Sequence, residues 1–123
     1  MSDSPADRQL YIVLGNPLTP EQDAEFNEWY NETHIPDVLA AVPGVRSAQR
    51  YKVRQLDRDA GTPPRFSYMV VYEVEGDPND IMAKIGAAVA SGAIRMDDAP
   101  FDRYKVNMAF WAPISEKIEN PAQ

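Results

Sequence analysis

The chain contains no cysteine and a single histidine among its 123 residues. Without cysteine, disulfide bonds, thiolate nucleophiles and thiolate-held metal ions are excluded. One imidazole with scattered carboxylates falls short of the clustered ligands that a metal site needs, so we expect no bound metal. Glycine-rich phosphate-binding loops are also absent, and we expect no nucleotide or other cofactor.

Positive charge is scarce as well. Twelve Lys and Arg stand against nineteen Asp and Glu, which gives a net charge of −7. A nucleic-acid-binding surface must neutralise phosphates with basic residues, so nucleic acid is excluded as a partner. Anionic membrane surfaces are disfavoured for the same reason. A small, neutral or apolar molecule is the partner that this charge favours.

Long apolar runs are missing too. No stretch approaches the roughly 20 apolar residues that span a bilayer. The polar start, residues 1–8, lacks the apolar core of a signal peptide, so we expect a cytoplasmic protein. The length fits one domain, which we place at residues 9–112, between a disordered N-terminal tail (1–8) and a C-terminal tail (113–123).

The apolar runs that are present alternate with turn residues and predict the order β-α-β-β-α-β. Strands are expected at residues 10–14, 45–56, 66–74 and 104–111, and helices within 19–42 and 78–91. Thr19 and Gln22 predict a capping box at the first helix. Pro36 predicts a break or kink near His34 and Ile35. An exposed hairpin loop is expected at residues 57–65.

This order predicts an α+β fold of the ferredoxin-like type: a four-stranded antiparallel sheet with two helices on one face. The expected strands carry apolar residues on both faces. The face without helices would be exposed in a monomer, and apolar patches of that size mark interfaces. We therefore expect a homodimer that closes through the open sheet face.

The single histidine lies on an aromatic stripe. Phe26, Trp29, Tyr30 and His34 share one face at helical spacing. Because imidazole exchanges a proton near neutral pH, His34 is the candidate catalytic acid or base. The alternative is a histidine that is satisfied by a carbonyl near a helix end. Asp37, three residues later, either orients the imidazole or caps the following helix.

Other candidates would bind the substrate. Tyrosines in the expected strands would donate hydrogen bonds to a carbonyl or enolate oxygen, and otherwise they pack in the core. Alternation places Tyr68 and Tyr72 on one face without fixing which face the helices cover, and we expect Tyr72 to face the cavity. An inward Asn107 would contact a ligand or, alternatively, backbone across a dimer. The predicted substrate-binding residues are Tyr11, Trp29, Tyr30, Asp37, Tyr51, Tyr72, Asn107 and Trp111.

One run also carries a resemblance. Glu25-Phe26-x-x-Trp29-Tyr30-x-x-x-His34-x-Pro36, followed by Pro43-Gly44-Val45 and Arg50-Tyr51, resembles the EthD-like families of the dimeric α+β barrel superfamily. Motifs carry the resemblance over residues 10–52, and only the element order carries it over 66–111. It implies the ferredoxin-like fold, a dimeric barrel and a cavity between helices and sheet. By resemblance, His34 matches the family histidine and Trp29-Tyr30 its aromatic pair.

Relatives in that superfamily include polyketide cyclases, muconolactone-type isomerases, dehydratases, monooxygenases and haem-degrading enzymes. The leading hypothesis is a cofactor-independent acid/base enzyme, an isomerase, dehydratase, cyclase or other lyase. It would act on a small aromatic or polyketide-like molecule, with His34 as the proton shuttle. One alternative is a non-catalytic ligand-binding or accessory protein. Another is a cofactor-free or haem-related monooxygenase.

Overall fold

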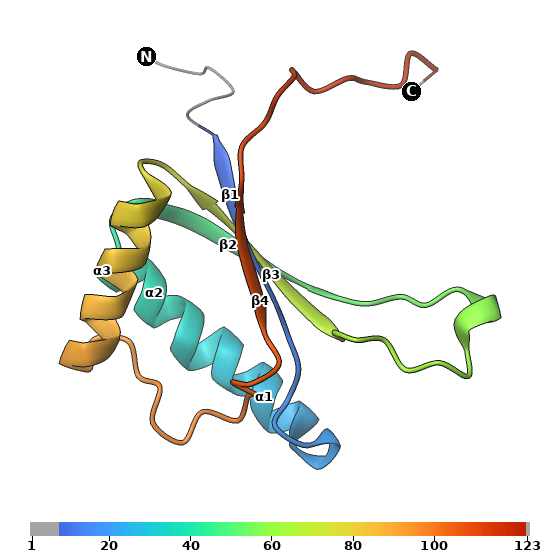
Figure 1. Ribbon diagram of the computed structural model, residues 1–123, viewed down its shortest axis with the longest axis horizontal. Coiled ribbons are helices and arrows are strands. Elements are labelled where there is room, and N and C mark those ends of the chain that lie inside the picture. The colour runs from blue at the N-terminus through green and yellow to red at the C-terminus, as the bar shows by residue number, and fades with distance from the viewer. Residues whose placement is uncertain (1–7, 123) are drawn as a thin grey trace.

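The computed structural model, which describes residues 8–122, is a single antiparallel sheet with helices on one face (Figure 1). The strand order is β2-β3-β1-β4, and every neighbouring pair is antiparallel. The strands are β1 (Gln9–Gly15), β2 (Val45–Lys52), β3 (Tyr68–Val74) and β4 (Asn107–Trp111). The helical elements beside them are α1 (Asp23–Trp29), the π-helical turn η3 (Tyr30–His34), α2 (Ile35–Ala41) and α3 (Pro78–Ser91). The predicted ferredoxin-like α+β fold is confirmed.

Three strands are shorter than predicted. β2 stops at Lys52 and β3 begins at Tyr68, so the hairpin between them is longer than expected and includes the short turn η4 (Asp57–Asp59). β4 begins at Asn107, which pairs with Leu14 near the end of β1. Beyond β1 the chain pairs with an earlier segment instead: the Asp102 N–H donates to the Asn16 carbonyl at 3.0 Å, and Pro17 forms an isolated bridge with Phe101.

The start of the first helix also differs from the prediction. A short 3-10 turn, η2 (Pro20–Gln22), precedes α1. The Thr19 hydroxyl donates to the Gln22 side-chain oxygen at 3.0 Å and caps no backbone N–H. The predicted capping box is therefore wrong, because the two side chains satisfy each other.

Pro36 does not break the helix. The chain stays in the right-handed helical region at His34 and Ile35, and α1, η3 and α2 follow one another as one rod (Figure 1). The Ile35 N–H donates to the Tyr30 carbonyl, five residues back. A proline has no N–H and crowds the carbonyl four residues earlier, and this wider turn carries the helix past it. The predicted kink is replaced by a π-helical turn.

The core lies between the helices and the sheet. Its largest fully buried side chains are Tyr72, Phe26, Ile81, Ile94, Val42 and Val74. The predicted second helix is confirmed as α3: the Asp77 carboxylate accepts the Asn79 N–H at its start, and Gly92, with φ of 85°, ends it. Only glycine adopts that φ readily.

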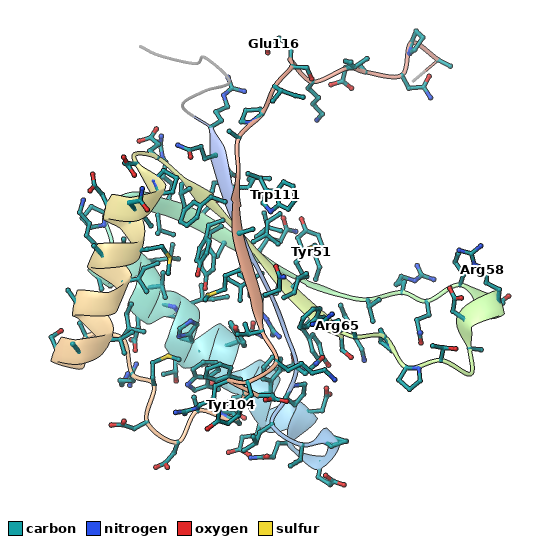
Figure 2. The ribbon with its side chains drawn as sticks, viewed as in Figure 1. Tyr51, Arg58, Arg65, Tyr104, Trp111 and Glu116 are labelled. Carbon is teal, nitrogen blue, oxygen red and sulfur yellow. The ribbon has the colours of Figure 1, made fainter. Side chains whose placement is uncertain are left out.

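The other face of the sheet carries no helix. The side chains of Tyr51 and Trp111 lie on this side, 44% and 58% exposed (Figure 2). The hairpin after β2 and the C-terminal segment after β4 both extend toward this side of the sheet (Figure 1). In the part of the chain that is described, no helix combines the length and the apolar character needed to cross a membrane. The expected tail at 1–8 falls outside the described residues except for Arg8, and the domain bounds stay predictions.

Candidate functional site

A cavity of about 310 Å³ lies between the helical layer and the sheet. Its volume is in the range of small-molecule sites. Most of its walls are apolar, and its polar side-chain groups are three phenols, one imidazole, one indole N–H and one guanidinium. The lining residues are Tyr11, Val13, Trp29, Tyr30, His34, Val38, Tyr72, Met82, Ile85, Val89, Met96, Phe101, Arg103, Val106 and Met108.

His34 reaches this cavity from the π-helical turn. Its imidazole stacks on the Trp29 indole, with ring centroids 4.6 Å apart and planes at 19°. The Tyr30 ring meets it edge-on, at 5.2 Å and 88°. The Nδ1 atom is buried without a hydrogen-bond partner among residues 8–122. The alternative of a histidine satisfied by a backbone carbonyl therefore has no support at this atom.

Burial sets the charge of the imidazole. Removal from water lowers the pKa of His34 from 6.5 to about 4, although the nearby Asp37 carboxylate opposes the shift. Desolvation disfavours the charged form of a histidine, and no hydrogen bond to the ring compensates. His34 is therefore neutral at neutral pH. It can accept a proton without first losing one to solvent.

Asp37 takes neither of its two expected roles. Arg95 Nε and Nη2 donate to its two carboxylate oxygens at 2.9 Å each, and the Arg95 backbone N–H donates at 3.0 Å. These bonds hold the pKa of the Asp37 carboxyl below its usual value. The pair ties α2 to the loop after α3. Asp37 acts on His34 only through its charge and does not line the cavity.

Three phenols line the cavity together with the imidazole. The Tyr11 hydroxyl donates to Met108 Sδ at 3.1 Å. The hydroxyls of Tyr30 and Tyr72 have no hydrogen-bond partner among the described residues, and both residues line the cavity. Burial raises the pKa of Tyr30 to about 12 and raises that of Tyr72 as well. Both phenols therefore stay protonated as hydrogen-bond donors, and Tyr72 lies on the cavity side of the sheet.

Three predicted residues lie elsewhere. Tyr51 pairs with Met69, Asn107 with Leu14 and Trp111 with Leu10. Side chains alternate along a strand, so these positions face away from Tyr11 and Tyr72. They lie on the open side of the sheet and cannot contact a ligand in this cavity. The phase of the strands, which the sequence left open, decides their placement.

The sequence interpretation missed the loop after α3. Phe101 stacks on Trp29 with centroids 5.7 Å apart and planes at 5°. The Arg103 guanidinium lies 5.8 Å from the centroid of the Phe101 ring. The planar groups thus form a row from His34 through Trp29 and Phe101 to Arg103. The only sequence signal was one aromatic residue after Pro100 in an otherwise polar segment.

Arg50, on β2, contacts Tyr30 and the helix that carries His34. Its guanidinium lies 4.9 Å from the centroid of the Tyr30 ring. Its Nη2 donates to Asn27 Oδ1 at 2.7 Å, and its Nη1 donates to Asn31 Oδ1 at 3.1 Å. β2 is thereby fastened to the helix that carries His34. Within residues 8–122, no group of three or more His, Asp or Glu side chains is placed to hold a metal ion.

No protein-family profile and no curated protein matches the sequence. Solved structures do match the fold. An EthD-like protein from Ralstonia eutropha aligns at a TM-score of 0.60 with 16% identity, covering 90% of this chain and 96% of its own. An ethyl tert-butyl ether D (EthD) family protein from Bacillus halodurans aligns at a TM-score of 0.53 with 16% identity, covering 87% of this chain and 99% of its own. A protein from Arabidopsis thaliana aligns at a TM-score of 0.55 with 11% identity, covering 89% of this chain and 99% of its own.

The fold is that of EthD-like proteins. The similarity to them that the sequence motif suggested is borne out at the level of structure. At such low identities the comparison establishes the fold and not a reaction. What happens in the cavity must be argued from its own side chains.

Proposed function

We propose that this protein is a cofactor-independent enzyme that moves protons on a small aromatic or polyketide-like ketone. The observation that carries the proposal is the neutral, unpaired imidazole of His34 beside two unpaired phenols in one apolar cavity. Such sites suit isomerisation, dehydration, cyclisation and related eliminations, which begin with loss of a proton next to a carbonyl.

His34 is the proton shuttle in this proposal. The neutral imidazole takes the proton from the carbon, and the electron pair of that bond moves to the carbonyl oxygen as an enolate. The imidazolium and the enolate are then a pair of opposite charges in a site with little water, where each stabilises the other. This mutual stabilisation compensates for the weak basicity of an imidazole whose pKa is about 4 before the ligand binds.

Tyr30 and Tyr72 stabilise the enolate oxygen in this proposal. Their hydroxyls have no protein partner among the described residues, and their raised pKa values keep the protons in place. A fixed donor that is aimed at a developing oxyanion lowers the barrier more than a donor that must turn away from another partner. We assign to them the carbonyl oxygen of the substrate.

The test uses β-tetralone, a bicyclic aryl ketone, in deuterated buffer, with exchange at the carbon next to the carbonyl followed by proton NMR. The wild-type protein is expected to accelerate exchange over buffer. His34→Gln should lower that acceleration by about 10²-fold or more, the usual size of a general-base contribution.

A matched pair of variants controls for the phenols. Tyr72→Phe removes a hydroxyl that lines the cavity, and Tyr51→Phe removes one on the open face. Only the first should slow exchange. If β-tetralone binds but exchanges no faster than in buffer, the protein binds ligands without this chemistry and the enzymatic proposal fails.

We further propose that two copies associate through the open sheet face. Ile12, Val71 and Ala109 lie side by side on it by register, with Trp111 and Tyr51 further out. Ile114 and Ile118, in the segment that extends toward the same side, are 100% and 88% exposed. A second copy would cover both sets of apolar side chains.

A further inference from the structure

Among the described residues that line the cavity, Arg103 is the one that carries a charge. Its guanidinium contacts the face of Phe101 and makes no ion pair or hydrogen bond with another described residue. It is exposed, so it stands where the cavity meets solvent. A cation with no partner at the entrance of an apolar cavity needs an explanation in a chain of net charge −7.

The row of planar groups gives Arg103 a fixed place relative to His34. The imidazole stacks on Trp29, Trp29 stacks on Phe101, and the guanidinium lies over Phe101. The reacting end of the cavity is thus at one end of the row and the cation is at the other. A ligand that lies along this wall presents one end to His34 and the opposite end to Arg103.

We infer that the substrate is an aromatic molecule with one carboxylate, which Arg103 binds at the entrance of the cavity. The inference rests on the proposed function and specifies its substrate class. The planar guanidinium matches a carboxylate through two parallel hydrogen bonds. A phosphate would bring a second negative charge, for which the described lining holds no further cation. The net negative charge of the protein disfavours anions at other places on its surface. Arg103 therefore also sets the orientation of the ligand, whose carboxylate stays at the entrance while the opposite end enters the cavity.

The experiment compares two probes of the same ring system and similar shape, the anionic β-naphthoate and the neutral β-naphthamide, by isothermal titration calorimetry. The wild-type protein should bind β-naphthoate more tightly, and added salt should weaken that binding because the pair is partly exposed. Arg103→Met, which retains an apolar stem, should weaken β-naphthoate about tenfold, the usual scale of a charge-assisted pair. β-Naphthamide should change less than about twofold.

Lys105→Met is the matched control. It removes the same charge two residues along, from an exposed side chain that does not line this cavity. It should leave both affinities unchanged. Equal losses for both probes in Arg103→Met would make the residue a support for Phe101 and overturn the inference.

The two proposals fail in different ways. If β-naphthamide binds as tightly as β-naphthoate and Arg103→Met affects neither, the carboxylate is refuted and the cavity remains a binding site. If neither probe binds the wild-type protein, the proposed small-molecule site is refuted, and the substrate class with it.

Discussion

At the scale of single residues, the unusual group is the imidazole of His34, which is buried away from water and gains no hydrogen-bond partner within residues 8–122 in exchange. Trp29 and Tyr30 enclose the imidazole, and Nδ1 has no acceptor or donor among the described residues. A buried polar atom without a partner costs free energy in the folded protein. It also leaves the atom ready for a ligand, which is how strain at a functional site is commonly retained.

This cost has a definite pH dependence. The pKa of His34 is about 4 in the folded protein against 6.5 in the unfolded chain. As the pH falls from 6.5 to 4, the unfolded chain takes up the proton first, so the free energy of unfolding falls. A shift of this size removes about 3 kcal/mol between neutral pH and about pH 4.

The measurement is urea unfolding of the wild type and of His34→Gln at both pH values and one protein concentration. The carboxylates contribute equally to the pH dependence of unfolding in both proteins. The difference between the two free energies of unfolding therefore isolates the effect of the imidazole. The wild type should lose about 3 kcal/mol more than the variant on acidification. A difference that does not vary with pH would contradict the assignment. Asp37, the nearest charge, is retained in both proteins.

At the scale of elements, the helix–strand connection depends on one close approach. A β-carbon built at Gly44 would lie 2.8 Å from the Glu75 carbonyl oxygen. The same stretch of backbone is fixed by the Glu75 N–H, which donates to the Gly44 carbonyl oxygen at 2.8 Å. Both atoms belong to backbone, so neither can move without disturbing the start of β2.

Gly44→Ala should therefore lower the free energy of unfolding by about 1–3 kcal/mol. Gly86→Ala is the matched substitution: nothing lies within 4 Å of its built β-carbon, and it sits inside α3. It should raise the free energy of unfolding by up to about 1 kcal/mol, since alanine favours helix over glycine. Chemical denaturation measures both. Equal effects of the two substitutions would contradict the contact at Gly44.

The elements also show where sequence reasoning succeeds. The run from Tyr68 to Val74 specified the strand, and alternation grouped Tyr68, Val70 and Tyr72 on one face, but it left open which face the helices cover. Asp77 and Gly92 mark the ends of α3 in the usual manner. These signals are local, so the sequence is enough to find them.

The elements that were misjudged depend on distant parts of the chain. A proline in a helical pattern is compatible with a break or a widened turn, and packing against the sheet selects the π-helical turn at η3. Asp37 finds Arg95, 58 residues along the chain, which no local pattern indicates. Phe101 and Arg103 reach the cavity from a loop, and loops carry little periodicity. The sequence therefore indicated Tyr11, Trp29, Tyr30, His34 and Tyr72, which all line the cavity, and not the wall that Phe101 and Arg103 form.

At the scale of the whole molecule, the sheet has one covered face and one open face. Helices cover one side of the sheet (Figure 1). By register and alternation Tyr11 and Tyr72 lie on that side, whereas Ile12 and Val71 lie on the other, where no helix or strand within residues 8–122 covers them. An apolar sheet face of this kind is normally buried against another surface. The open face of this sheet therefore needs a second layer to bury its apolar side chains. A second copy of the chain would supply that layer by symmetry.

The homodimer can be tested at Val71, which pairs with Ile12 in the middle of the open face. Sedimentation equilibrium of the wild type should give twice the chain mass of 13.8 kDa. Val71→Glu places a carboxylate from each copy in the interface. Two buried, unpaired charges cost at least about 3 kcal/mol, which weakens association about a hundredfold. Leu39→Glu puts the same charge on α2, on the opposite side of the sheet, where Leu39 is 37% exposed, and should remain dimeric. A monomeric wild type, or a Val71→Glu variant that associates as tightly as the wild type, would contradict a sheet-to-sheet dimer. Circular dichroism of each variant establishes that the loss of association is not a loss of fold.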